Sequence, residues 1–170
     1  METGEMERKI RELYLRMIEF DAGQPALIQH FTKVYSYARL IAEAETEDLE
    51  IRNTVEAAAL VHDIAIPMCR EKYGSDAGPL QEREGPELAR NMLMTLGFPE
   101  GMTQRVCALV GEHHTYLPID GMDHQILIEA DFIVNSFEGE HGLEKRRRIL
   151  EDIFKTDTGR HIYAEMFGMT

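Results

Sequence analysis

The sequence predicts an all-α protein, a single-domain helical bundle of about six to eight helices. Apolar residues recur at intervals of three and four along nearly the whole chain, which is the periodicity of a buried helix face. No segment shows the sustained alternation of apolar and polar residues that is typical of a strand. A chain of 170 residues also has the size of one ordinary domain with one hydrophobic core.

The first two helices are separated by the break "DAGQP". The first is expected from about residue 5 to 20, with Ile18 among its inward residues. The second begins at Pro25, because proline suits the first turn of a helix. Its apolar stripe has His30 at one edge, so this histidine is expected near the core.

A third helix is expected to start after Asn53 as N-cap and to end at Pro67, because proline cannot continue a helix. His62 then lies on its apolar face. The segment from Cys69 to Gly85 is rich in glycine and charge, which predicts a long loop that could act as a lid. Pro86 is expected to open the fourth helix.

The second half of the chain contains a fifth helix, whose apolar arc includes His113. A helix from about residue 123 to 138 follows, with Phe137 at the end of its core face. Asp131 falls inside that apolar face. The segments "LEKRRRILEDIF" and "RHIYAEMF", separated by "KTDTG", predict one or two further helices.

The composition excludes several classes of protein. A net charge of −13 and a pI near 4.9 argue against a nucleic-acid surface, which needs a basic face, and favour small ligands. Cys69 and Cys107 are isolated and are expected to be reduced, buried thiols. The N-terminus is charged and no run of 18 apolar residues occurs, so we expect a cytoplasmic protein without a membrane span.

Four polar residues on inward helix faces form a candidate metal site. A single inward histidine is more often an ordinary core residue than a ligand, but an aspartate in an apolar stripe needs a cation, a metal or several donors. One divalent cation would satisfy all of them together. Such a donor set suits six-coordinate Mn, Fe, Co, Ni or Mg, or Zn with fewer ligands. The expected ligands are His30, His62, Asp63 and Asp131.

This arrangement resembles the HD superfamily of metal-dependent phosphohydrolases, which is named for an H…HD…D pattern. His30 matches the first histidine, "HD" at 62 and 63 the central pair, and Asp131 in "ILIEADFIVN" the final aspartate. The segments "EGPELARNML" and "VCALVGEHH" are similar to the linking helices of that family. The resemblance implies one HD domain over residues 1–170, with its metal-site core at about 27–138 and a C-terminal helical extension at 139–170.

The sequence also departs from its relatives. Binuclear members generally have a histidine where this chain has "LQEREG", so the resemblance implies one divalent metal ion per chain. His113 or His114 stands where those members have another ligand, and Glu82 could substitute as a carboxylate. Ile66 replaces the Glu of nucleotidase-like members and the Lys of cyclic-dinucleotide hydrolases, which argues against both substrate groups.

The expected function is hydrolysis of a small phosphorylated metabolite or nucleotide-like substrate by a metal-activated water. Asp63, Glu82 or Glu84 could accept the proton of the water, and His113 or His114 could protonate the leaving group or bind phosphate. Lys33, Arg70 and Lys72 are candidate phosphate-binding cations, although each is more typical of an exposed charge.

Two alternatives stay open. One is a di-iron HD-type oxygenase, and the other is a non-catalytic metal-binding regulatory module. The expected partner is a small phosphorylated molecule, with no nucleic acid and no membrane. The oligomeric state is left open, with a homodimer as one option.

Overall fold

A computed structural model describes residues 3–169, which form nine helices and no strand. The all-α prediction is confirmed. One helix more than expected is present, because the segment predicted as a long loop is largely helical. The helices are α1 (Thr3–Phe20), α2 (Pro25–Glu45), α3 (Leu49–Val61), α4 (Ile66–Tyr73), α5 (Gly78–Thr95), α6 (Glu100–Glu112), α7 (Gly121–Glu138), α8 (Leu143–Asp152) and α9 (Asp157–Met166).

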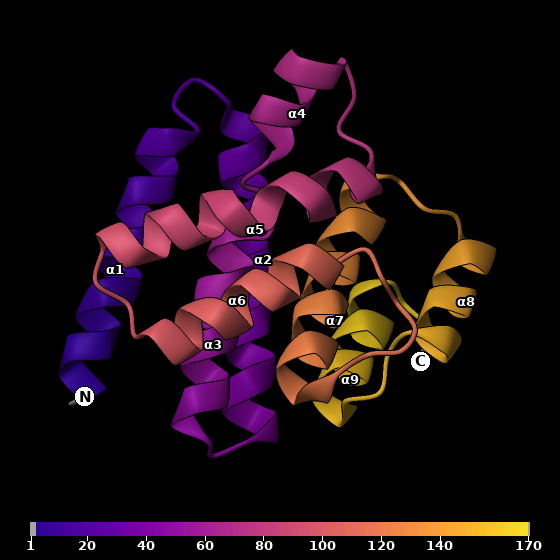
Figure 1. The fold of residues 1–170 in the computed structure, drawn as a ribbon. Helices are drawn as coiled ribbons and strands as arrows, with labels where there is room; N and C mark the ends of the chain where they lie inside the picture. The colour runs from indigo at the N-terminus through magenta and orange to yellow at the C-terminus, as the bar shows by residue number, and fades with distance from the viewer. Residues whose placement is uncertain (1–2, 170) are drawn as a thin grey trace.

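Helix α3 forms the centre of the bundle and contacts α1, α2, α6 and α7 (Figure 1). Every residue from Thr54 to Val61 is buried. Three consecutive alanines, Ala57 to Ala59, let neighbouring helices approach this helix from several sides. In Figure 1, α5 and α6 lie as a pair across the bundle, and α9 lies beside α7.

Both ends of α3 differ from the prediction. Asp48, and not Asn53, is the N-cap, and its Oδ1 accepts hydrogen bonds from the next turn of backbone N–H groups. The helix ends at Val61, and residues 62–65 form turns. Pro67 therefore stands in the first turn of α4, where its missing N–H costs little. The break precedes the proline because the proline ring would clash with a carbonyl four residues back.

The expected loop over residues 69–85 is wrong. Helix α4 continues to Tyr73 and α5 begins at Gly78, so only residues 74–77 are irregular. Gly74 ends α4 with a left-handed φ of 65°, which glycine adopts without strain. Pro86 lies inside α5 and does not open it, so the long lid that the composition predicted is absent from this part of the chain.

Helices α5 and α6 pack closely through glycine. A Cβ at Gly85 would lie 2.7 Å from Val110 Cγ1, and one at Gly111 would lie 3.2 Å from Pro86 Cγ. The ring of Pro86 therefore packs against Gly111, where a side chain would crowd it. This close approach places the C-terminal end of α6 beside the first turns of α5.

Two residues predicted to face inward lie at the edge of the core. Ile18 is 38% exposed and Phe137 is 64% exposed, because each is at the end of its helix stripe. Cys69 is buried, Cys107 is half-buried, and both are free thiols. Among residues 3–169, no helix is long and apolar enough to cross a membrane.

The C-terminal segment packs on α7 through a buried carboxylate. Glu129 is fully buried and its Oε1 accepts hydrogen bonds from the backbone N–H groups of Lys155 (2.6 Å) and Thr156 (2.9 Å). Thr156 is also the N-cap of α9. A hydrogen bond of 2.7 Å between Ser136 and Tyr163 adds a second buried contact. Helix α9 is therefore fixed to the bundle.

Candidate metal centre

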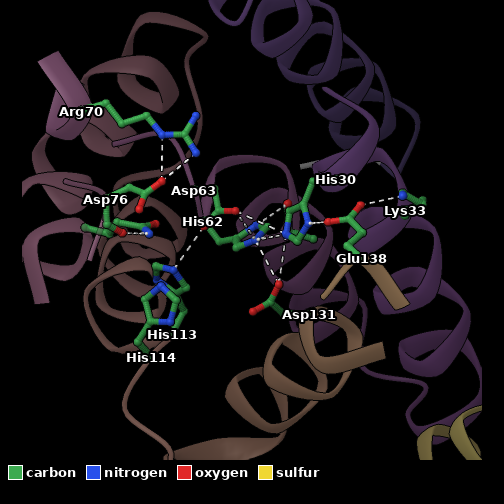
Figure 2. Close-up of polar contacts among 12 residues, drawn as sticks. His30, Lys33, His62, Asp63, Arg70, Asp76, His113, His114, Asp131 and Glu138 are labelled. Carbon is green, nitrogen blue, oxygen red and sulfur yellow. Dashed lines mark hydrogen bonds and ion pairs between the residues drawn. The ribbon is translucent and has the colours of Figure 1, made fainter. Parts of the chain in front are cut away.

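Four side chains from distant parts of the chain converge between α2, α3 and α7 (Figure 2). His30 comes from α2, and Asp131 comes from the middle of α7. His62 and Asp63 directly follow α3, where the turn at residues 62–65 aims both side chains at one point. The break in the helix explains how two adjacent residues can contribute to the same cluster.

The distances between donor atoms match a shared ion. His30 Nε2 lies 3.3 Å from His62 Nε2, 3.3 Å from Asp63 Oδ2 and 3.1 Å from Asp131 Oδ1. His62 Nε2 lies 3.3 Å and 3.6 Å from the same two oxygens. Donors about 2.0–2.2 Å from one ion, at tetrahedral or octahedral angles, are roughly 2.8–3.6 Å apart. His30, His62 and Asp63 therefore fit a divalent metal ion, and Asp131 lies close enough to both histidines to join them.

The other ring nitrogen, Nδ1, has a hydrogen-bond partner in His30, in His62 and in the nearby His113. His62 Nδ1 donates to Ala59 O at 2.9 Å, and His113 Nδ1 donates to Val110 O at 2.8 Å. His30 Nδ1 pairs with Glu138 Oε2 at 2.7 Å. Because carbonyl and carboxylate oxygens accept, each Nδ1 carries a proton, so the neutral form of each ring has its lone pair on Nε2, on the side of the cluster. This is the tautomer that a metal ligand needs.

The cluster is electrostatically prepared for positive charge. Burial lowers the pKa of His62, but Asp63 and Asp131 outweigh it and raise this pKa well above its ordinary value. Burial also lowers the pKa of His30, but the hydrogen bond to Asp131 together with the charges of Asp63 and Asp131 outweighs it and raises this pKa. Burial raises the pKa of Asp63, yet the histidines hold it well below its usual range. Two carboxylates here need cationic partners, which a divalent ion would supply.

A second group of donors shares Asp63. Its Oδ1 lies 3.4 Å from His113 Nε2, while its Oδ2 faces the first cluster. His114 joins Asp63 and His113 in a second set whose donor atoms lie within 4.8 Å of one another. The Nε2 atoms of both histidines are buried and have no hydrogen-bond partner among residues 3–169. This set could bind a second ion or a substrate.

Glu82 is already engaged in holding a turn. Its Oε1 accepts hydrogen bonds from His114 N at 3.0 Å and from Thr115 Oγ1 at 2.9 Å. Glu84, also considered as a base, accepts a hydrogen bond of 2.6 Å from Tyr73 and lies on α5, not in a loop. Both carboxylates therefore have structural partners.

The three candidate cations are paired with carboxylates. Arg70 contacts Asp76 Oδ2 at 2.6 and 2.7 Å, and Lys33 Nζ lies 2.6 Å from Glu138 Oε1. Figure 2 shows these two pairs on either side of the cluster. Lys72 lies 3.6 Å from Glu84.

Two acidic residues near the cluster were not predicted. Glu138 follows Asp131 by seven positions, so helical spacing along α7 could have indicated a shared face. Asp21 is 3% exposed and its Oδ1 has no hydrogen-bond partner in the described chain. Burial, followed by the charge of Asp63, raises the pKa of Asp21 to about 6. No sequence pattern indicated Asp21, because it follows α1 in a turn.

The fold and the site define an all-helical domain with a buried histidine–aspartate cluster that could hold a divalent metal. The profile of the HD domain matches residues 27–159, which is more than three quarters of the chain. The chain belongs to the HD domain family, a superfamily of metal-dependent hydrolases.

A solved structure agrees with this assignment. The chain is similar to the crystal structure of a "predicted HD superfamily hydrolase" from an uncultured Thermotogales bacterium, with 25% identity and a TM-score of 0.66. The match covers 95% of this chain and 85% of that one. No curated protein matches the sequence significantly.

Proposed function

We propose that this protein is a phosphohydrolase that uses one divalent metal ion to hydrolyse a small phosphorylated metabolite or a nucleotide-like substrate. The observation that carries the proposal is that two imidazole nitrogens, 3.3 Å apart, each lie 3.1–3.6 Å from one carboxylate oxygen of Asp63 and one of Asp131. The hydrolase named among similar structures supports the reaction class.

The proposed ligands are His30, His62, Asp63 and Asp131. Their mixed nitrogen and oxygen donors suit Mn, Fe, Co, Ni, Mg or Zn. When bound, such an ion supplies Lewis acidity toward a phosphoryl oxygen and toward water.

The chain's own residues supply proton transfer and orientation. Asp63 directs one oxygen to each donor group, so its carboxylate is positioned to accept a proton from an attacking water. The Nε2 atoms of His113 and His114 have no hydrogen-bond partner in the described chain. His114 Nε2 is available to donate to a phosphate oxygen, whereas His113 has its proton on Nδ1 and protonates a leaving group only after Nε2 takes up a second proton. Burial and the neighbouring His113 lower the pKa of His114, which favours its neutral form as a hydrogen-bonding group. In this proposal Glu82 orients the turn that carries His114.

The test is a screen of phosphorylated metabolites and nucleotides for release of inorganic phosphate. Each compound is incubated with chelator-treated protein that is then resupplied with Mn²⁺, Co²⁺, Ni²⁺, Mg²⁺, Zn²⁺ or Fe²⁺. We expect turnover of at least one compound, loss of turnover with EDTA and recovery on addition of metal. A metal-loaded protein that turns over no phosphorylated compound would contradict the proposal and indicate a regulatory metal-binding module.

A second candidate function is a di-iron oxygenase, which the second donor group favours. Asp63 faces both groups, as a bridging carboxylate between two ions would. Its weakness is the small donor set of the second group, which among residues 3–169 has only His113 and His114 besides the shared aspartate. Substrate-dependent oxygen consumption by protein holding two equivalents of iron would favour this candidate over hydrolysis.

A further inference from the structure

Three buried histidines point Nε2 into the centre, but their Nδ1 partners differ. His62 and His113 donate to backbone carbonyls three residues earlier, at 2.9 and 2.8 Å. His30 instead pairs with the side chain of Glu138, 108 positions away, at 2.7 Å. The orientation of His30 therefore depends on another helix, whereas the other two rings are held by their own chain segments.

Glu138 is at an unfavourable place for a carboxylate. It is the last residue of α7, and the dipole of a helix disfavours negative charge at its C-terminal end. Only about a third of its side chain is exposed, so solvent does not fully compensate the charge. Its two oxygens are instead taken by His30 at 2.7 Å and by Lys33 at 2.6 Å. Locally unfavourable residues, such as a carboxylate at a helix C-terminus, are expected mainly where function requires them.

Two residues of α7 contact two residues of α2 around the ring of His30. Helix α7 supplies both Asp131 and Glu138, seven positions apart, and α2 supplies both His30 and Lys33, three positions apart. Asp131 Oδ1 contacts His30 Nε2 at 3.1 Å, while Glu138 Oε2 contacts Nδ1 of the same ring. The imidazole is thus fixed at both nitrogens, as Figure 2 shows.

We infer that Glu138 is a positioning residue for the metal centre, which keeps the Nε2 lone pair of His30 directed at the ion, and that Lys33 holds Glu138 in place. The inference rests on the proposed metal site but not on the identity of the substrate. A carboxylate behind a ligating histidine fixes its tautomer and ring orientation and strengthens it as a ligand. Without Glu138, the ring of His30 can rotate or exchange its tautomer.

The test measures metal affinity and not turnover. Each protein is first freed of metal with a chelator and then competes with a chromophoric chelator for Co²⁺. The proteins compared are wild type, Glu138→Ala, Glu138→Gln and Lys33→Met. Loss of an outer-shell partner typically costs about 10–100-fold in metal affinity, which we expect for Glu138→Ala. Glu138→Gln should weaken binding less, because its amide oxygen can still accept from Nδ1–H. Lys33→Met should have the smallest effect of the three.

The matched control is Glu140→Gln, which removes the same charge from an exposed residue two positions later. Its Co²⁺ affinity should equal that of wild type. The melting temperatures of the metal-free proteins give a second measurement. Loss of a purely structural salt bridge would lower the melting temperature without changing the affinity for Co²⁺.

The outcomes distinguish this inference from the proposed function. If wild type binds Co²⁺ and Glu138→Ala binds it within twofold, the positioning role is wrong and the metal site stands. If Glu138→Ala lowers only the metal-free melting temperature, the residue is merely structural and the inference is likewise overturned. If wild type binds no Co²⁺, Mn²⁺ or Zn²⁺, the metal site and the inference both fail.

Discussion

The Nε2 atoms of His30 and His62 lie 3.3 Å apart, although 32 positions separate the two residues in the chain. The Nδ1 atoms of both rings have hydrogen-bond partners that accept, so in their neutral forms the two rings direct their Nε2 lone pairs at each other in a buried site. Such an arrangement needs a shared proton or a cation. A divalent ion between the two rings would meet that need, and its removal should therefore have measurable consequences.

Metal removal should destabilise the fold. A ligand that binds only the native state at 100 times its Kd adds about 2.7 kcal/mol, and 1 kcal/mol shifts the melting temperature of a chain this size by roughly 2–4 °C. We therefore expect a loss of about 5–10 °C after EDTA treatment and recovery on addition of metal. Unchanged melting curves, with metal loss verified by elemental analysis, would argue against an ion that supports the fold.

Elemental analysis should find one tightly held metal per chain. Two histidines and two aspartates serve the first group, whereas in the described part of the chain the second has only the shared Asp63 with His113 and His114. The second group should therefore bind an ion more weakly, so that it is lost on dialysis. Two equivalents of iron that survive dialysis, with the absorption of a bridged pair, would favour the oxygenase.

Asp21→Asn should stabilise the metal-free protein at neutral pH but not at acidic pH. The pKa of Asp21 rises from 3.8 to about 6 in the fold, so the native state binds more protons than the unfolded state between those values. Stability from this residue is therefore lost as pH rises from about 4 to 6, by up to about 3 kcal/mol. The asparagine avoids this penalty. We expect a higher melting temperature for the variant at pH 7.5 and equal values near pH 4; an equal gain at both values would exclude this explanation.

Gly159→Ala should destabilise the C-terminal helix without affecting metal binding. A Cβ at this position would collide with the buried carboxylate of Glu129 and lie 2.7 Å from Thr156 Oγ1. Overpacking of this kind typically costs about 1–3 kcal/mol. Gly101→Ala is the control, because a Cβ there meets nothing within 4 Å. Denaturant unfolding measures both, and equal stability of the two variants would show that Glu129 can move aside.

Periodicity predicted most helices because their buried faces follow three- and four-residue spacing. It failed over residues 69–85, where glycine and charge predicted a loop. There α4 and α5 are helical nonetheless, and close packing through Gly85 and Gly111 stabilises the α5–α6 pair. Local rules favour Pro86 at the start of a helix, but its tertiary contact with α6 overrides that preference.

In the candidate site, sequence pattern predicted the ligands but not the residues that hydrogen-bond to them. The expected ligands His30, His62, Asp63 and Asp131 do converge. They could be predicted because each is a polar residue in an otherwise apolar stretch of the sequence. The partners of these residues were not visible in the sequence. Glu138 is meaningful only because α2 and α7 are adjacent, and the hydrogen bonds of Glu82 depend on how α5 meets the end of α6. Such contacts follow from tertiary packing and not from local pattern.

A comparison of Asp63→Ala with Ile66→Ala in phosphate release would decide whether the metal centre performs hydrolysis. Asp63 supplies an oxygen to each donor group, and its loss should lower metal-dependent hydrolysis by orders of magnitude while the fold survives. Ile66 is buried in α4, and its truncation should cost roughly 2–5 kcal/mol of stability but spare activity per folded molecule. The measurement is the rate of inorganic phosphate release at equal folded fraction, with the best substrate and metal of the wild type. We expect a near-complete loss for Asp63→Ala alone, and a wild-type rate for that variant would contradict the proposed role of the centre.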